Sequence, residues 1–288
     1  MRVGIVGLGL IGGTVAKALK PYHKISGFDI STDTIEYAKT NQIIDEAYTN
    51  LEYFFKANDV VFLCLYPNDI VNFIFQNKHL IPISSLIIEM SGIKKYLIDK
   101  IHDIGILPFD IVYSHPIAGS EKIGIRYSNA NIFKEANYII TPVKSNLSKN
   151  IDIAKNLAKE MGFKYISIIS KEEHDNIIAY TSQLTHVLSL SLVNAISTNL
   201  DTKRFIGDSY RDLTRISIIN NTLWPELFIY NKEYLLEKIS DFEDSLKEIK
   251  DAIATNDWQK LSKLMQKSTK IRLDIETGKN NESWCLPI

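Results

Sequence analysis

The stretch Arg2-Val3-Gly4-Ile5-Val6-Gly7-Leu8-Gly9-Leu10-Ile11-Gly12-Gly13 opens the chain and decides the fold of its first half. The short apolar run that ends at Val6 predicts a strand, and the helical pattern after the glycines predicts a helix that continues to Leu19. A second apolar run, residues 24–28, ends at Asp29. This succession of strand, glycine-rich turn, helix, strand and acid is typical of a dinucleotide-binding unit.

The glycines of this turn have separate tasks. Gly7 allows a tight turn out of the strand, Gly9 lets a pyrophosphate approach the backbone, and Gly12 lets the helix lie close to the sheet. The free N–H groups at the positive end of the helix dipole then face the phosphates. Taken alone, such a motif could also be a tight turn without a ligand. Its context favours cofactor contacts from Gly7, Leu8, Gly9, Leu10, Ile11 and Gly12.

Asp29 indicates which dinucleotide binds. Its carboxylate can accept hydrogen bonds from a ribose 2′-OH, whereas it would repel a 2′-phosphate. The residues that follow, Ile30, Ser31 and Thr32, supply no arginine to neutralise such a phosphate. We therefore expect NAD rather than NADP as the cofactor.

Length and composition limit the class of protein. A chain of 288 residues suggests two domains, and 45% apolar with 23% charged residues is ordinary for a globular protein. The net charge of −1 gives no reason to expect nucleic acid or a membrane surface as a partner. Cys64 and Cys285 form neither a disulfide framework nor a metal pattern, and no signal peptide or membrane span is recognisable. We expect a cytoplasmic protein without a metal site.

The first half of the chain alternates between strand and helix patterns. Further strands are predicted at residues 59–65, 85–89, 110–114, 138–141 and 164–169. Helices are predicted at 32–40, from a cap at Asn68 or Asp69 to 76, up to 102, and at 149–161. This alternation predicts an α/β domain with a Rossmann-type, doubly wound sheet over residues 1–168.

The sequence pattern of the second half predicts helices and no strands. A long, mostly apolar helix is expected over residues 177–196, followed by a polar break at 199–211. Further helices are predicted at 213–219, 224–230, 232–255 and 257–273. We expect an all-α substrate and dimerisation domain over residues 169–288, because so apolar a helix needs cover on nearly all sides.

Ligands of open α/β sheets bind at the carboxyl ends of the strands, and reactive groups lie in two such segments. One contains Ser91, and the other begins with His115-Pro116. His115 could be a structural imidazole, or the general base that a nicotinamide enzyme needs near its ring.

Two pairs in the helical half are also candidates. Gln183 and His186 share a helix face, as a buried polar pair or as part of a ligand site. Arg211 and Arg215 are one turn apart, as a surface pair or as a guanidinium fork for a carboxylate.

With these residues in view, the sequence resembles the prephenate/arogenate dehydrogenases of tyrosine biosynthesis. The most specific matches are His115-Pro116-Ile117-Ala118-Gly119-Ser120-Glu121, Asp212-Leu213-Thr214-Arg215-Ile216, Leu223-Trp224 and Asn231. The segments 182–186 and 89–94 are similar to the family's Ser-His-Leu-Pro-His and Asp-x-x-Ser-x-Lys stretches. The family's usual serine falls at Gly92, one position after Ser91, and Gln183 replaces the first histidine of the helix motif.

The resemblance implies NAD-dependent oxidative decarboxylation of prephenate to 4-hydroxyphenylpyruvate. From the apolar helix of the second half we also expect a homodimer through the C-terminal helices. The resemblance makes His115 the catalytic base, with Ser91 beside it and close to the cofactor. It makes Arg215 the anchor of a substrate carboxylate and places His186 in the lining of the substrate pocket. We also expect Gln183 and Arg211 to bind the substrate. The alternatives are an arogenate dehydrogenase, a β-hydroxyacid-type dehydrogenase, which would use a lysine on the first long helix of the second domain, and a non-catalytic NAD-binding regulator.

Overall fold

The computed structural model describes residues 1–195 and 204–277. The chain forms two compact units, residues 1–232 and 233–288, which are described separately below. These units do not coincide with the two domains predicted from the sequence, whose boundary lies between residues 168 and 169. The first unit also contains several of the helices that follow the sheet.

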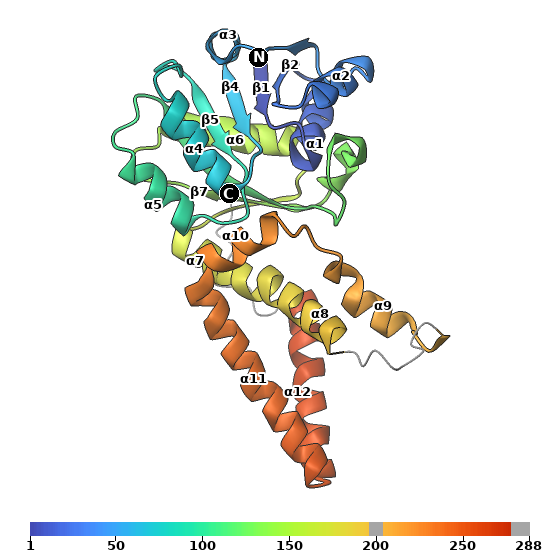
Figure 1. Ribbon diagram of the computed structural model, residues 1–288. Coiled ribbons are helices and arrows are strands. Elements are labelled where there is room, and N and C mark those ends of the chain that lie inside the picture. The colour runs from blue at the N-terminus through green and yellow to red at the C-terminus, as the bar shows by residue number, and fades with distance from the viewer. Residues whose placement is uncertain (196–203, 278–288) are drawn as a thin grey trace. The chain divides into compact units, whose positions relative to one another are not determined.

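The first unit is built on one eight-stranded sheet with the order β3-β2-β1-β4-β5-β6-β7-β8. All neighbouring strands run parallel except β6 and β7, which are antiparallel. The strands are β1 (Arg2–Val6), β2 (Lys24–Phe28), β3 (Glu46–Ala47), β4 (Val60–Leu63), β5 (Leu86–Glu89), β6 (Asp110–Ile117), β7 (Asn137–Thr141) and β8 (Tyr165–Ile168). The predicted α/β fold is thereby confirmed (Figure 1).

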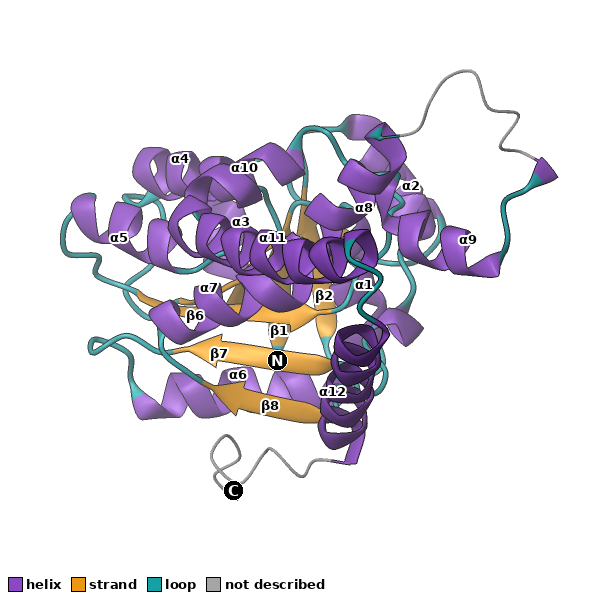
Figure 2. Ribbon diagram, turned by 90° about the horizontal axis from the view of Figure 1, so that it is seen from below, coloured by secondary structure: helices purple, strands orange, loops and turns teal. Residues whose placement is uncertain are grey.

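Helices cover both faces of this sheet. They are α1 (Leu10–Leu19), α2 (Thr32–Thr40), α3 (Leu51–Ala57), α4 (Pro67–Asn77), α5 (Lys95–Asp103) and α6 (Ser148–Glu160). Alternate residues of a strand face different cores: Val60 and Phe62 of β4 join the core that includes α1 and α6, and Val61 and Leu63 join that of α3, α4 and α5. Figure 2 shows α6 on one side of the sheet and α4 and α5 on the other. Burial on both faces explains why the strands read as continuous apolar runs.

Two local predictions for the part of this unit that forms the sheet were wrong. The strand expected to end at Ser114 continues to Ile117, because its last residues pair with the antiparallel strand β7, so that His115 lies within a strand. Helix α4 starts earlier than expected, since its N-cap is Tyr66. The carboxylate of Glu226 accepts a hydrogen bond from the N–H of Asn68 at 3.0 Å in its first turn.

The apolar helix predicted from residue 177 is interrupted by a π-helical turn. It consists of α7 (Lys171–Ile178), the π turn Ala179–Gln183 and α8 (Leu184–Asn194). Residues 196–203, where this helix was expected to end and the polar break to begin, lie outside the described residues. The first unit continues with α9 (Asp208–Thr214), a short 3₁₀ helix (Arg215–Ser217) and α10 (Leu223–Tyr230).

The second unit contains α11 (Lys232–Ala254) and α12 (Trp258–Thr277). Within the part of the chain that the structure describes, no helix is both long and apolar enough to cross a membrane.

Candidate active site

The glycine turn between β1 and α1 has the shape of an anion cradle. Gly7 has a φ of +85°, in the left-handed region that favours glycine, and a β-carbon on Gly12 would stand 1.9 Å from the carbonyl oxygen of Gly7. A β-carbon on Gly9 would meet nothing within 4 Å, so open space lies beside the backbone there. Gly9 is also the N-cap of α1 and has no side chain to accept the first N–H groups of that helix. These features fit a pyrophosphate.

Asp29 lies directly beyond β2, beside this cradle. Its Oδ2 accepts a hydrogen bond from the N–H of Leu8 at 2.7 Å, and its Oδ1 accepts one from the N–H of Ser31 at 2.9 Å. One carboxylate therefore connects the glycine turn to the start of α2. Each oxygen has a second lone pair, with which it can accept a hydrogen bond from a ribose hydroxyl.

His115 extends from β6 into a hydrogen-bonded chain. Its Nδ1 lies 2.9 Å from Nε2 of His174, and Nδ1 of His174 lies 2.6 Å from Oδ1 of Asp175. The ring of His115 is partly buried, and this burial, together with the neighbouring His174 and Lys94, holds the pKa of the imidazole well below its usual value. His115 is thus neutral at pH 7, as a general base must be.

His174 and Asp175 belong to the first turns of α7, and sequence analysis missed both. The helix starts with a capping box in which Ser170 and Glu173 bond each other. Asp175 is buried and accepts hydrogen bonds from the N–H groups of Lys94 and Lys95, both at 2.9 Å. The signal in the sequence was an adjacent imidazole and carboxylate just before a long apolar helix.

A fully buried ion pair supports the loop that follows β5. Lys94 Nζ lies 2.5 Å from Glu89 Oε2 and donates another hydrogen bond to the carbonyl oxygen of Ser91. The N–H of Ser91 donates to Glu89, and its hydroxyl donates to the carbonyl oxygen of Ile93 at 3.1 Å. The hydroxyl of Ser91 is thus engaged within its own loop. Gly92 is the residue beside the imidazole, since a β-carbon there would stand 3.5 Å from Nε2 of His115.

The π turn places Gln183 and His186 in different surroundings. Gln183 is 1% exposed; its Nε2 donates to the carbonyl oxygen of Leu227 at 2.9 Å, and its Oε1 accepts from Asn231 at 2.8 Å. His186 lies with its ring centroid 3.7 Å from that of Trp224 on α10. Gln183 therefore fixes α10, whose Leu227 also lies beside Gly92. A π turn at this point is consistent with a functional site.

The two arginines differ in what they contact. The side chain of Arg215 is 67% exposed and lies 3.8 Å from the carboxylate of Glu121. Burial lowers the pKa of His186, and the nearby positive charge of Arg215 lowers it further. Arg211 donates to the carbonyl oxygen of Ile206 at 3.1 Å, at the start of its own helix. Arg215, rather than Arg211, thus lies beside another candidate residue.

Together these contacts form a continuous path between the candidates. Gly92 lies beside both His115 and Leu227 of α10. Trp224, also on α10, packs against the ring of His186, whose pKa is lowered in part by the charge of Arg215. The path starts beyond the carboxyl end of β5, whose last residue pairs with Tyr113, two residues before His115. A neutral imidazole and a largely exposed guanidinium are thereby available for a small acidic molecule.

Two family models match the chain. The model described as "Prephenate dehydrogenase, nucleotide-binding domain" matches residues 15–167. The model described as "Prephenate dehydrogenase, dimerization domain" matches residues 170–267.

Relatives and solved structures agree with these models. The cyclohexadienyl dehydrogenase of Zymomonas mobilis is 28% identical over 285 residues, which are 96% of each chain. The prephenate dehydrogenase of Bacillus subtilis is 28% identical over 265 residues, 89% of this chain and 71% of that one. The crystal structure of prephenate dehydrogenase from A. aeolicus with hydroxyphenyl propionate and NAD⁺ superposes with a TM-score of 0.87 at 28% identity, covering 96% of this chain and 98% of that one.

Proposed function

The chain belongs to the prephenate dehydrogenase family, and we propose that it catalyses the NAD-dependent oxidative decarboxylation of prephenate to 4-hydroxyphenylpyruvate. The observation that supports this assignment best is the position of His115. Its Nδ1 is bonded to His174, and its Nε2 faces Gly92 beyond the carboxyl end of β5. This is the end of the sheet at which open α/β folds bind their ligands.

His115 is proposed to act as the general base. Its neutral Nε2 takes the proton of the ring hydroxyl while the hydrogen on the same carbon leaves as hydride. NAD, when bound, supplies the hydride acceptor. Loss of the ring carboxylate as CO₂ then restores aromaticity, and the proton held at Nε2 returns to the phenolic oxygen, so that charge and protons balance.

Arg215 is proposed to hold a carboxylate of the substrate. A guanidinium presents a planar fork of donors that matches a carboxylate, and its contact with Glu121 at 3.8 Å leaves these donors available. His186 would border the same substrate, with its ring held by Trp224. The role of Gln183 would be indirect, through α10, and the roles predicted for Arg211 and Ser91 stay predictions.

The glycine turn and Asp29 are proposed to hold NAD. The N–H groups of Leu10, Ile11 and Gly12, in the first turn of α1, would receive the pyrophosphate, with the backbone of Gly7, Leu8 and Gly9 around it. Asp29 would accept hydrogen bonds from the adenosine ribose.

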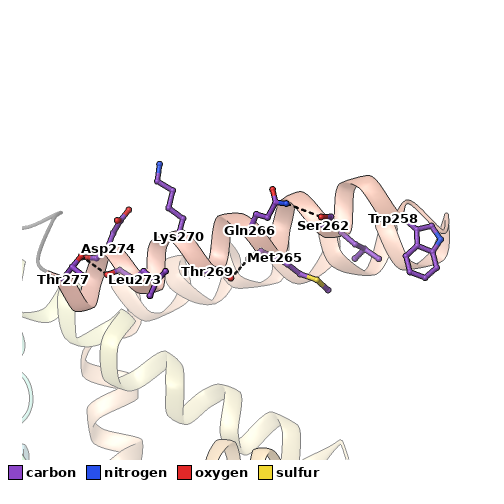
Figure 3. A pocket seen from close by; sticks show the side chains of 10 residues that line it. Trp258, Ser262, Met265, Gln266, Thr269, Lys270, Leu273, Asp274 and Thr277 are labelled. Atoms are coloured by element: carbon purple, nitrogen blue, oxygen red, sulfur yellow. Dashed lines mark hydrogen bonds between the residues drawn. The ribbon is translucent and has the colours of Figure 1, made fainter.

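We further propose that the chain functions as a homodimer, with a dinucleotide domain of residues 1–168 and a substrate and dimerisation domain of residues 169–288. The match of residues 170–267 to a dimerization-domain model supports this division. Exposed apolar side chains on α12, among them Trp258, Met265 and Leu273, support an interface there (Figure 3). Sedimentation of the full chain, and of Met265→Glu, measures the oligomeric state; a monomeric wild-type protein would refute the dimer.

Arogenate is the second candidate substrate, because it carries an amino group in place of the keto group on the same cyclohexadienol. The Zymomonas relative is named a cyclohexadienyl dehydrogenase, a name that fits either substrate. NADH absorbance with each substrate in parallel separates the two. His115→Asn should bind NAD and lose about 10²–10⁴-fold in turnover. Near wild-type turnover by this variant would refute the assignment of the base.

A further inference from the structure

The hydrogen-bonded chain behind His115 determines where its proton resides. His115 Nδ1 lies 2.9 Å from His174 Nε2, and His174 Nδ1 lies 2.6 Å from Asp175 Oδ1. His174 and Asp175 are buried, with exposed fractions of 0% and 1%. Each contact joins two nitrogens, or a nitrogen and a carboxylate oxygen, so the donor in each case can be worked out from the chemistry of the groups.

The carboxylate of Asp175 determines which nitrogen donates in each of these hydrogen bonds. Asp175 already accepts hydrogen bonds from the N–H groups of Lys94 and Lys95, at the start of α5, and an ionised carboxylate has only acceptors to offer. Nδ1 of His174 must therefore carry a hydrogen and donate it to Asp175. In a neutral imidazole the other nitrogen is then an acceptor, so Nε2 of His174 accepts from Nδ1–H of His115.

We propose that His174 and Asp175 are positioning residues that hold His115 in the Nδ1–H tautomer, so that the lone pair of Nε2 is presented to the substrate. This role rests on the proposed function of His115 as the base. It gives the protein a His–His–Asp chain in which only the first imidazole touches the substrate.

The alternative tautomer shows why such a device matters. With a hydrogen on Nε2, His115 would present a donor to the substrate hydroxyl and could not take its proton. Without His174 nothing in this chain of contacts would select between the two neutral forms, and a fraction of the enzyme would be inactive at any moment.

The surrounding charges act on the same imidazole. Glu89, the last residue of β5, and Lys94, at the start of α5, form a buried pair, while His174 and Asp175 lie behind the ring on α7. When Nε2 takes a proton, Nδ1–H becomes a stronger donor to His174, and the carboxylate of Asp175 lies at the far end of the chain to offset the positive charge. The cation of Lys94 opposes that charge but is paired with Glu89.

The tautomer can be measured in the wild-type protein. Nitrogen-15 NMR of the histidine side chains, with His115 assigned by comparison with His115→Asn, distinguishes a protonated from an unprotonated ring nitrogen. At pH 7 we expect Nδ1 of His115 and Nδ1 of His174 to be protonated and both Nε2 atoms to be unprotonated. A hydrogen on Nε2 of His115 would overturn the proposal, and the spectrum needs neither substrate nor turnover.

Variants test the consequence for activity. His174→Phe keeps a ring of similar size without an acceptor, and His174→Gln restores an amide oxygen that can accept from Nδ1–H. We expect His174→Phe to lower kcat about 10- to 100-fold with an unchanged KM for NAD, which is less than the loss of the base itself. The acid limb of the pH profile should also move, because Nδ1 of His115 loses its hydrogen-bond partner. His174→Gln should recover part of kcat and of the pH profile.

The comparison variant is His102→Phe, on the exposed side of α5, which should leave kcat and the pH profile unchanged. Wild-type kcat and an unmoved acid limb in His174→Phe would overturn the proposal. A wild-type protein that oxidises neither prephenate nor arogenate would instead refute the proposed function, and the tautomer measured by NMR would still decide the proposal. If His174→Phe does not fold, the NMR spectrum and His174→Gln decide it in the same way.

Discussion

A β-carbon built on Gly92 would stand 3.5 Å from Nε2 of His115, and equally 3.5 Å from a methyl group of Leu227. Both distances are ordinary van der Waals contacts, and the backbone of Gly92 is outside the left-handed region. The glycine at this position is thus not required by the backbone, and small side chains fit between the imidazole and α10.

This geometry predicts a graded response at residue 92. Gly92→Ala should raise the free energy of unfolding by about 0.4–1 kcal/mol, because it restricts only the unfolded chain. Gly92→Ser should be as stable and, with its hydroxyl within reach of Nε2, should have a kcat at least equal to that of Gly92→Ala. Gly92→Val should lower the free energy of unfolding by about 1–3 kcal/mol through overpacking. Its activity should fall as well. Urea unfolding and NADH absorbance measure both; a fully active Gly92→Val would contradict this placement.

Asp29 should control both the affinity for NAD and the choice of cofactor. Asp29→Ala removes the acceptor of the Leu8 and Ser31 N–H groups and the partner of the ribose. The KM for NAD should rise about 10- to 100-fold, since hydrogen bonds to a charged group contribute about 1.5–3 kcal/mol. The ratio of activity with NADP to activity with NAD should increase. Asp33→Ala, in the exposed first turn of α2, is the control, and an equal effect there would argue against a specific role for Asp29.

Arg215 should matter for the substrate and not for the cofactor. Arg215→Gln should raise the KM for the cyclohexadienol about 10- to 100-fold and leave the KM for NAD unchanged, because a charge-assisted contact to a carboxylate is lost. Arg215→Lys should recover only part of the affinity, since an ammonium lacks the planar fork. Arg211→Gln should have the smaller effect, as Arg211 is bonded to Ile206. Initial rates over both concentrations measure this, and a larger loss in Arg211→Gln would reverse the assignment.

The parts of the fold and site that were predictable are those encoded in local patterns. The glycine turn and the strands buried on both faces follow from spacing and composition alone, and both are in the structure. The continuation of β6 through His115 was not predictable in this way, because it depends on pairing with β7, which follows about 20 residues later.

Contacts between distant segments explain what was missed at the site. His115 and His174 are 59 residues apart in sequence, and only the docking of α7 beside the sheet brings their rings within hydrogen-bond distance. Gln183 matched a ligand position by its motif, yet the fold uses its amide to bond Leu227 and Asn231 of the following segment. In both cases a local motif identified the residue type, and the tertiary partner determined its task.

Removal of only one partner of the buried pair Glu89 and Lys94 should strongly reduce the free energy of unfolding. Both side chains are fully buried, and burial lowers the pKa of Lys94 while Glu89 opposes that change. Lys94→Met should cost about 3–5 kcal/mol, because it leaves an unpaired carboxylate in the core. Lys94→Met combined with Glu89→Leu should cost less than the sum of the two single changes. Additive costs in a denaturant series would show that the two groups are not coupled.

The lowered pKa values of His115 and His174 predict that acid weakens both stability and activity. Burial favours the neutral imidazole in the folded state, whereas the unfolded chain takes up protons near the usual pKa of 6.5. As the pH falls below 6.5 the unfolded state therefore binds more protons, and the free energy of unfolding decreases by up to about 1.4 kcal/mol per pH unit for each histidine, until the folded-state pKa is reached. Activity should stay level at pH 7 and decline only below the ordinary histidine range. Urea unfolding at pH 7, 6 and 5 tests this. His115→Gln should flatten the dependence and the exposed His102→Gln should not, and an equal slope in all three proteins would contradict the assignment.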